Sequence, residues 1–330
     1  MISPTAPAAA PAEPAAADSP LSDAGVSNGE HARRLIHRLT RRLVALQAPV
    51  LEDTDPEPLH QMRVSMRRLR TVVRQFGPAL DLPGAVTERR IGRVGRRLGL
   101  ARDLDVLRDL LEQEFLPHLP QEEVRRLRAV RRRLRRERAL AAEALAETLR
   151  GGAYLGMLER LQRWHRRPAF TPLGEQPLRE WLVEWQAPLL APLFLHPGWF
   201  VTGRRGDPES VHDLRKTLKA VRYSLENLED VTGEACRAWA LRCRHLQTLL
   251  GDLNDLRVLR DVIEDGLSHR LRGALPAMHG LLRERGRRLW QQWREEAEEL
   301  QRPERRHALL GDLLPECAAS PPPPPLASPS

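Results

Sequence analysis

Residues 59–76, LHQMRVSMRRLRTVVRQF, return in altered form 152 residues later as residues 211–228, VHDLRKTLKAVRYSLENL. In the first copy, apolar residues recur every three or four positions, which predicts a helix with one buried stripe. Basic residues and a histidine follow the apolar residues by one position. Because successive helical residues lie about 100° apart, this row lies beside the buried stripe rather than opposite it. The pattern therefore favours a cationic groove between helices.

Each copy carries one such row of cations. The first row is His60, Arg63, Arg67, Arg70 and Arg74, and the second is His212, Arg215, Lys219 and Arg222, ended by Glu226. Lys216 and Lys219 are the only lysines of the chain, and Lys219 takes the position of Arg67. This position therefore favours positive charge rather than one particular side chain. The alternative interpretation is a solvated helix face with scattered ion pairs, and for the two histidines a structural role in the chain.

A second block repeats at the same offset. Residues 98–107, LGLARDLDVL, align with residues 250–259, LGDLNDLRVL. Two blocks in one register indicate a duplicated unit of about four helices. We predict an all-α fold with two tandem four-helix-bundle-like repeats related by a pseudo-twofold axis. In the first repeat we expect two short helices, over residues 85–98 and 101–116, separated by a turn near Gly99. In the second repeat we expect helices over residues 234–250 and 253–269.

The domain boundaries follow from composition. Residues 1–29 are rich in Ala and Pro and residues 302–330 are Pro-rich, so both ends are predicted to be disordered tails. Between them we place repeat one at 30–166, a Pro-containing linker at 167–177 and repeat two at 178–301. No secretion signal and no apolar run long enough for a membrane span are present. We therefore expect a cytoplasmic protein.

The charge balance points to an anionic partner. The formal net charge is +9 and the pI is about 10.6. Arginine supplies nearly all of the positive charge, and a GC-rich genome accounts for much of that excess. A basic chain favours polyanions such as nucleic acid, an anionic lipid surface or polyphosphate. A second basic wall is predicted on the next helix, at Arg90, Arg93 and Arg97, with Arg242 and His245 at the positions equivalent to the first two.

Several charged residues have two open interpretations. Asp103 and Asp255 match across the repeat and either begin a helix or neutralise an arginine below the groove. Asp105 is replaced by Arg257 in the second copy, which argues against a metal site. The arginine-rich residues 125–138 are predicted to be a solvated helix, with an auxiliary anion-binding surface as the alternative.

Sequence motifs for catalysis are missing. The chain has no Gly-rich phosphate loop, no GxSxG, no HExxH and no CxxC pair. Its carboxylates form no repeated inward cluster. We therefore expect no enzymatic activity, no cofactor and no metal site.

The two H-x-x-R helices resemble the conserved histidine α-helical domain, or CHAD, family. LHQMRVSMRRLR is similar to the opening signature of that family and VHDLRKTLKAVR to its second-half equivalent, and both LGLARDLDVL and LLGDLNDLRVL resemble its second block. The resemblance spans roughly residues 30–300. It implies a duplicated helical bundle with a basic central channel that binds inorganic polyphosphate, and association with polyphosphate granules in bacteria. By position, the channel residues would be His60, Arg63, Arg67, Arg70, His212, Arg215, Lys219 and Arg222.

The predicted polyphosphate-binding set adds outer cations to these channel residues. They are Arg74, Arg90, Arg93, Arg97, Lys216, Arg242 and His245. No triphosphatase-type domain precedes the helical part, so the chain resembles the stand-alone kind. Protonation of His60 and His212 predicts tighter binding near pH 6 than near pH 8. The alternatives are a nucleic-acid-binding helical protein and an accessory subunit of an enzyme that processes phosphoanhydrides.

Overall fold

The computed structural model describes residues 25–203, 207–267 and 270–313. These residues form helices and no strand, apart from two isolated bridges, so the predicted all-α fold class is confirmed. The helices are α1 (Asn28–Glu52), α2 (Pro56–Phe76), α3 (Glu88–Asp109), α4 (Gln121–Arg126), α5 (Arg128–Arg150), α6 (Gly152–Arg166), α7 (Leu182–Phe194), α8 (Pro208–Thr232), α9 (Glu234–Asp265), α10 (Leu271–Ala274), α11 (Pro276–Gln301) and α12 (Pro303–Leu313). None of them is both long and apolar enough to cross a bilayer. The pseudo-twofold relation between the two repeats stays a prediction.

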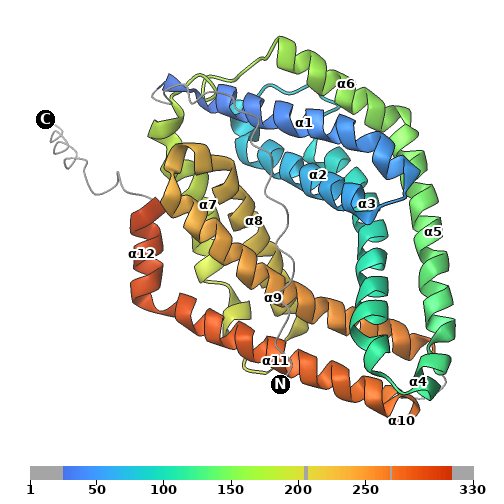
Figure 1. The fold of residues 1–330 in the computed structure, drawn as a ribbon. Helices are drawn as coiled ribbons and strands as arrows, with labels where there is room; N and C mark the ends of the chain where they lie inside the picture. Colours follow the sequence, from blue (N-terminus) through green and yellow to red (C-terminus); the bar gives the residue numbers. More distant parts are fainter. Residues whose placement is uncertain (1–24, 204–206, 268–269, 314–330) are drawn as a thin grey trace, which may run out of the picture.

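Helix α2 lies at the centre of the first half and is packed against α1 and α3 (Figure 1). Its start follows from local chemistry, since Asp55 accepts a hydrogen bond from the amide of Glu57 and Pro56 occupies the first turn. The predicted apolar stripe is its buried face, and Met62, Met66 and Leu69 are fully buried. Helix α5 packs on the far side of α3, and α6 packs on α1.

Helix α8 has the same place in the second half, between α7 and α9. Asp207 caps it by accepting from the amides of Glu209 and Ser210. Leu214 and Leu218 of its apolar stripe are fully buried. Helix α11 packs on α9, and the halves meet where α2 lies against α8 and α3 against α9 (Figure 1).

The predicted turn at Gly99 and the predicted division of residues 234–269 into two helices are wrong. α3 runs unbroken through Gly99, and α9 runs unbroken through Gly251. A glycine inside a helix costs only about 1 kcal/mol relative to alanine, which the packed apolar faces on either side outweigh. Because each helix continues, the two short helices predicted for each half form a single rod, α3 in the first half and α9 in the second.

Both predicted ends of the helical part need adjustment. α1 begins at Asn28, with Ser27 accepting from the amide of Glu30. Residues 303–313, which were assigned to the C-terminal tail, form α12, because Leu309 is buried in the second core and Trp239 donates to Asp312 at 3.0 Å. The disorder predicted for residues 1–24 and 314–330 lies outside the described residues.

A buried carboxylate ties the two halves together at one corner of the molecule, where α4 meets α10 and α11 (Figure 1). Glu123 of α4 accepts from the amides of Ala277 and Met278 at 2.8 and 2.9 Å. Those amides belong to the first turn of α11, where a negative charge also complements the helix dipole. Residues 167–177, predicted to be the linker, run back across the first half, and Thr171 donates to the carbonyl of Pro78.

Candidate functional site

The structure brings the centres of the two cationic rows together between α2 and α8. Lys219 of the second row is half-buried, and its neighbours include Arg67 and Arg63 of the first row and Arg215 of its own. Burial, followed by the charges of these arginines, lowers the pKa of Lys219 to about 6. Three arginines and a lysine that readily loses its proton therefore face one another across the boundary between the halves.

Two arginines, Arg63 and Arg215, hold equivalent places in the rows and are half-buried. Burial lowers the pKa of both. Their Nε atoms are buried without a hydrogen-bond partner among the described residues. Buried donors of this kind are normally satisfied by protein, water or ligand, so both Nε atoms can donate to an acceptor from outside the protein.

Two aspartates lie close to these arginines. Asp103 Oδ1 accepts from Arg63 Nη2 at 2.9 Å, and the charge of Asp255 acts on Arg215. Burial raises the pKa of Asp255. Both aspartates are in helix interiors, so neither begins a helix, and of the two predicted roles the neutralising one fits the structure. They offset only part of the positive charge.

The two histidines lie at the same end of their rows. His60 is half-buried and His212 exposed. Burial lowers the pKa of both, and nearby arginines lower it further, chiefly Arg102 for His60 and Arg215 for His212. The imidazoles are therefore mostly neutral at pH 7 and gain protons only when the pH falls or an anion is added.

The outer ends of the rows differ from their centres. Arg70 is exposed and pairs with Glu88 at 2.8 Å, and Arg74 is exposed without an ion pair among the described residues. Arg222 is only 9% exposed, stacks 4.3 Å from the ring centre of Tyr223 and pairs with Glu226 at 3.4 Å. Arg222 is thus already neutralised.

Glu226 is a residue whose importance the sequence pattern did not show. Its side chain is 4% exposed and it pairs with Arg68 of α2 at 2.9 Å and with Arg244 of α9 at 3.0 Å, besides Arg222. The sequence identified it only as the end of the row. Arg222 is four residues earlier on the same helix, but Arg68 and Arg244 come from α2 and α9, and no spacing along α8 could have indicated them.

The predicted second wall is not one surface. Arg90, Arg93 and Arg97 are exposed on α3 and have no ion pair in the described parts of the chain. Arg242 and His245 instead face acids of α11: His245 lies 3.7 Å from Glu296, and the charge of Arg242 acts on Glu299. Lys216 of α8 pairs with Asp213.

Arg102, which was not among the predicted site residues, belongs to the first half of the site. It is half-buried, and its charge acts on both His60 and Arg63. The spacing of the first row could not have indicated it, because the row lies on α2 and Arg102 lies on α3.

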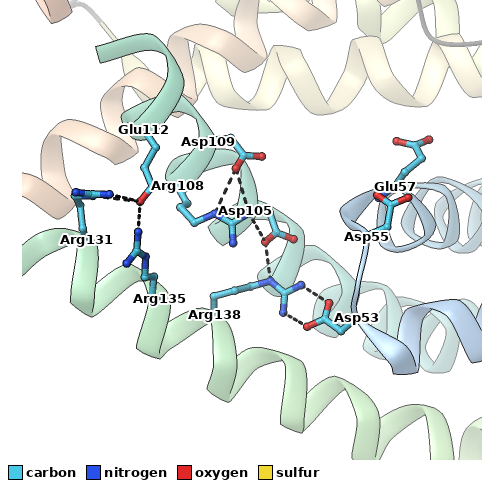
Figure 2. Close-up of polar contacts among 10 residues, drawn as sticks. All are labelled: Asp53, Asp55, Glu57, Asp105, Arg108, Asp109, Glu112, Arg131, Arg135 and Arg138. Carbon is cyan, nitrogen blue, oxygen red and sulfur yellow. Dashed lines mark hydrogen bonds and ion pairs between the residues drawn. The ribbon is translucent and has the colours of Figure 1, made fainter. Parts of the chain in front are cut away.

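The arginine-rich residues 125–138 are only in part the solvated helix that was predicted. Figure 2 shows Arg138 between two acids, with Asp105 at 2.7 Å and Asp53 at 2.6 Å. Glu112 of the segment after α3 accepts from Arg131 at 3.2 Å and from Arg135 at 2.9 Å. These three arginines join α5 to its neighbours, so they are structural.

The described residues give no support for a metal site. Among the described residues, no group of three or more acidic, histidine or cysteine side chains is arranged to hold an ion. Asp105, the residue considered for a metal site, is instead the buried partner of Arg138.

With this geometry established, comparison with known proteins identifies the class. The family model of the CHAD domain matches residues 34–264, well over half of the chain, so the protein belongs to the CHAD domain family. Among solved structures, the chain is similar to the crystal structure of the CHAD domain from the plant Ricinus communis, with 24% identity, a TM-score of 0.60, and coverage of 88% of this chain and 93% of that one. It is also similar to PptA from Streptomyces chartreusis, with 15% identity, a TM-score of 0.58, and coverage of 82% and 99%. At these identities the likeness shows the shared fold. The comparison with curated proteins finds no match.

Proposed function

We propose that the protein binds inorganic polyphosphate, without catalysis, in the groove where the two cationic rows meet. The observation that carries this proposal is the cluster around Lys219, where burial and then the charges of Arg67, Arg215 and Arg63 depress its pKa to about 6. Such mutual repulsion costs folding energy unless an anion relieves it. Membership of the CHAD family supports the same ligand class.

A linear phosphate chain suits a row of cations better than a single phosphate does. His60, Arg63 and Arg67 lie along one helix face and present donors at successive turns, as do His212, Arg215 and Lys219. The guanidinium group offers paired donors that match phosphate oxygens. Binding by charge neutralisation releases counterions, so affinity should fall steeply with salt. A cytoplasmic location at polyphosphate granules forms part of this proposal.

The sparse aromatics argue against single-stranded nucleic acid as the main ligand. Binders of single strands combine a basic groove with aromatic side chains on which bases stack. Tyr223 is the aromatic residue beside the second row, and it is 2% exposed beneath Arg222. It therefore presents no face to a base.

The test measures binding of fluorescently labelled polyphosphate by anisotropy at several salt concentrations. Arg63→Gln and Arg215→Gln should each weaken binding about tenfold, or ~1.4 kcal/mol, and lower the salt slope by about 1. Arg136→Gln is the matched control, because Arg136 is exposed on α5 without an ion pair among the described residues. If the two groove variants bind like the parent chain, the groove assignment fails.

Competition separates this proposal from its alternatives. Unlabelled polyphosphate should displace the probe at far lower phosphate concentration than RNA or duplex DNA does at the same salt. We expect no phosphate release from polyphosphate, with or without Mg²⁺. Stronger competition by RNA would favour the nucleic-acid alternative, and steady phosphate release would contradict a purely binding role.

A further inference from the structure

A pocket of about 370 Å³ lies between α8, α9 and α11 in the second half. One part of its wall is cationic, with Arg215, Arg257 and Arg283, and another part is apolar, with Leu253, Leu256 and Trp290. Its size is that of a small-molecule site, and a largely apolar wall with a few polar groups is typical of such sites. It shares only Arg215 and His212 with the cationic rows.

The sequence register explains why the pocket exists in this half. The 152-residue offset also relates α5 to α11, placing Gly286 at the position of Leu134 and Trp290 at the position of Arg138. Leu134 is 1% exposed, so its side chain occupies space in the core of the first half. Gly286 has no side chain to occupy the equivalent space. On α9, which packs against α11, Arg257 occupies the position that Asp105 occupies on α3.

These exchanges remove the ion pair that closes the first half. There, Arg138 and Asp105 bridge α5 and α3 at 2.7 Å (Figure 2). An arginine and a tryptophan at the equivalent places cannot form that bridge. Both residues instead line the pocket.

The pocket carries an excess of positive charge. Among its described lining residues, Asp207 is the one acid, against four arginines and two histidines. Asp207 already accepts from the first amides of α8. Outside the pocket, Asp261 is shared between Arg257 at 3.8 Å and Arg260 at 3.1 Å. The buried Nε of Arg215 has no hydrogen-bond partner among the described residues.

We propose that this pocket binds a small phosphorylated molecule that carries a planar ring, the chemical class of the nucleoside triphosphates. Phosphates would lie against Arg215 and Arg257, and the ring against Trp290 and the leucines. A bare phosphate chain has no apolar surface and would leave that wall unused. The pocket shares Arg215 with the groove, whereas its α11 wall lies beyond the residues that the CHAD family model matches.

The experiment compares ATP, tripolyphosphate and adenosine by titration calorimetry on the full chain. ATP should bind at least tenfold more tightly than tripolyphosphate, and adenosine should bind weakly, because both parts of the wall must be used. Equal affinity for ATP and tripolyphosphate on the unmodified chain would overturn the proposal without any variant.

Two variants then assign the binding to the pocket. Trp290→Ala should remove the advantage of ATP over tripolyphosphate, and Arg257→Gln should weaken ATP at least tenfold. Arg288→Gln is the control on the same helix, since its side chain is 71% exposed and outside the pocket. Full ATP affinity in Trp290→Ala would overturn the assignment. Unchanged circular dichroism and polyphosphate binding would show that the variants are folded, and neither variant alters a predicted groove residue, so failure here is distinct from failure of the groove.

Discussion

The seam between α3 and α5 is closed by ion pairs, whereas the equivalent seam between α9 and α11 contains a pocket. In the first, Asp105 is almost fully buried and Arg138 supplies its partner. In the second, Arg257 and Trp290 stand at those positions. The helices pack in the same order in both halves. The comparison teaches that the apolar stripes set the helix arrangement, while a few charged positions decide whether a seam is closed or open.

The largest expected effect concerns Glu226, which has no counterpart in the first half because the equivalent residue is Arg74. Glu226→Ala leaves Arg68, Arg222 and Arg244 without their shared partner, and removing one member of a buried ionic cluster costs about 4 kcal/mol. Urea unfolding measures the change. Arg74→Ala is the control and should change stability by less than about 0.5 kcal/mol. Equal effects at the two positions would contradict the asymmetry between the halves.

The next effect tests the closed seam itself. Arg138→Ala leaves the buried carboxylate of Asp105 with Arg108, at 3.7 Å, as its one remaining ion-pair partner among the described residues. The change should destabilise the protein by about 3 kcal/mol. Arg163→Ala removes an exposed pair with Glu159 and should cost less than about 0.5 kcal/mol. A loss below about 1 kcal/mol for Arg138→Ala would mean that apolar packing, not the ion pair, holds this seam together.

A smaller effect with the opposite sign is expected at Lys219, whose counterpart is Arg67. Because the pKa of Lys219 falls from 10.5 to about 6 on folding, the unfolded chain binds more protons between these pH values. Stability is therefore lost as the pH falls from 10.5 toward 6. Lys219→Met should stabilise the protein by about 1–2 kcal/mol at pH 7. The gain should vanish near pH 10, and a gain that does not depend on pH would refute the electrostatic explanation.

The same residue makes polyphosphate binding depend on pH. An anion in the groove raises the pKa of Lys219, so binding takes up a proton and should tighten as the pH falls from 8 to 6. His60 and His212 add to this below about pH 6.5, because their pKa values are lowered in the free protein. Lys219→Arg introduces the residue type of the equivalent Arg67. Polyphosphate affinity should then change little between pH 8 and 6.5. An unchanged profile would assign the pH dependence to other groups.

The smallest effect is expected at the exposed end of the first row. Arg70→Gln removes a surface pair with Glu88, so stability should change by less than about 0.5 kcal/mol. If Arg70 contacts phosphate, the salt slope of polyphosphate binding falls by about 1. A slope equal to that of the parent chain would exclude Arg70 from the groove.

Several features of the molecule were predictable because they depend on neighbours along the chain. The periodicity of residues 59–76 and 211–228 predicted α2 and α8, and their apolar stripes are buried. The helix starts are also local, because Asp55 and Asp207 accept from the first amides of α2 and α8. The turn predicted at Gly99 failed because local helix propensity is weak beside tertiary packing. α12 was missed because the arginines and prolines around it obscured the apolar contacts of Leu309.

For the candidate site, the sequence identified more cations than the structure brings together around Lys219. Arg63, Arg67, Arg215 and Lys219 lie together, as the spacing predicted. Arg222 and Lys216 are basic like Arg215 and Lys219 on the same helix, but they form ion pairs with Glu226 and Asp213. Arg242 and His245 face α11. No pattern within one helix distinguishes a free cation from one that another helix neutralises.

The repeated spacing alone was sufficient to establish an all-α chain with two basic rows, because helical periodicity is a property of each segment by itself. Tertiary structure decided which of those cations keep their charge available and which seam stays open. Both outcomes depend on which residues distant helices bring into contact. Glu226 forms an ion pair with Arg68 of another helix, whereas Trp290 carries no charge that could pair with Arg257. Electrostatic and packing energies depend on distance in space, not on separation along the chain.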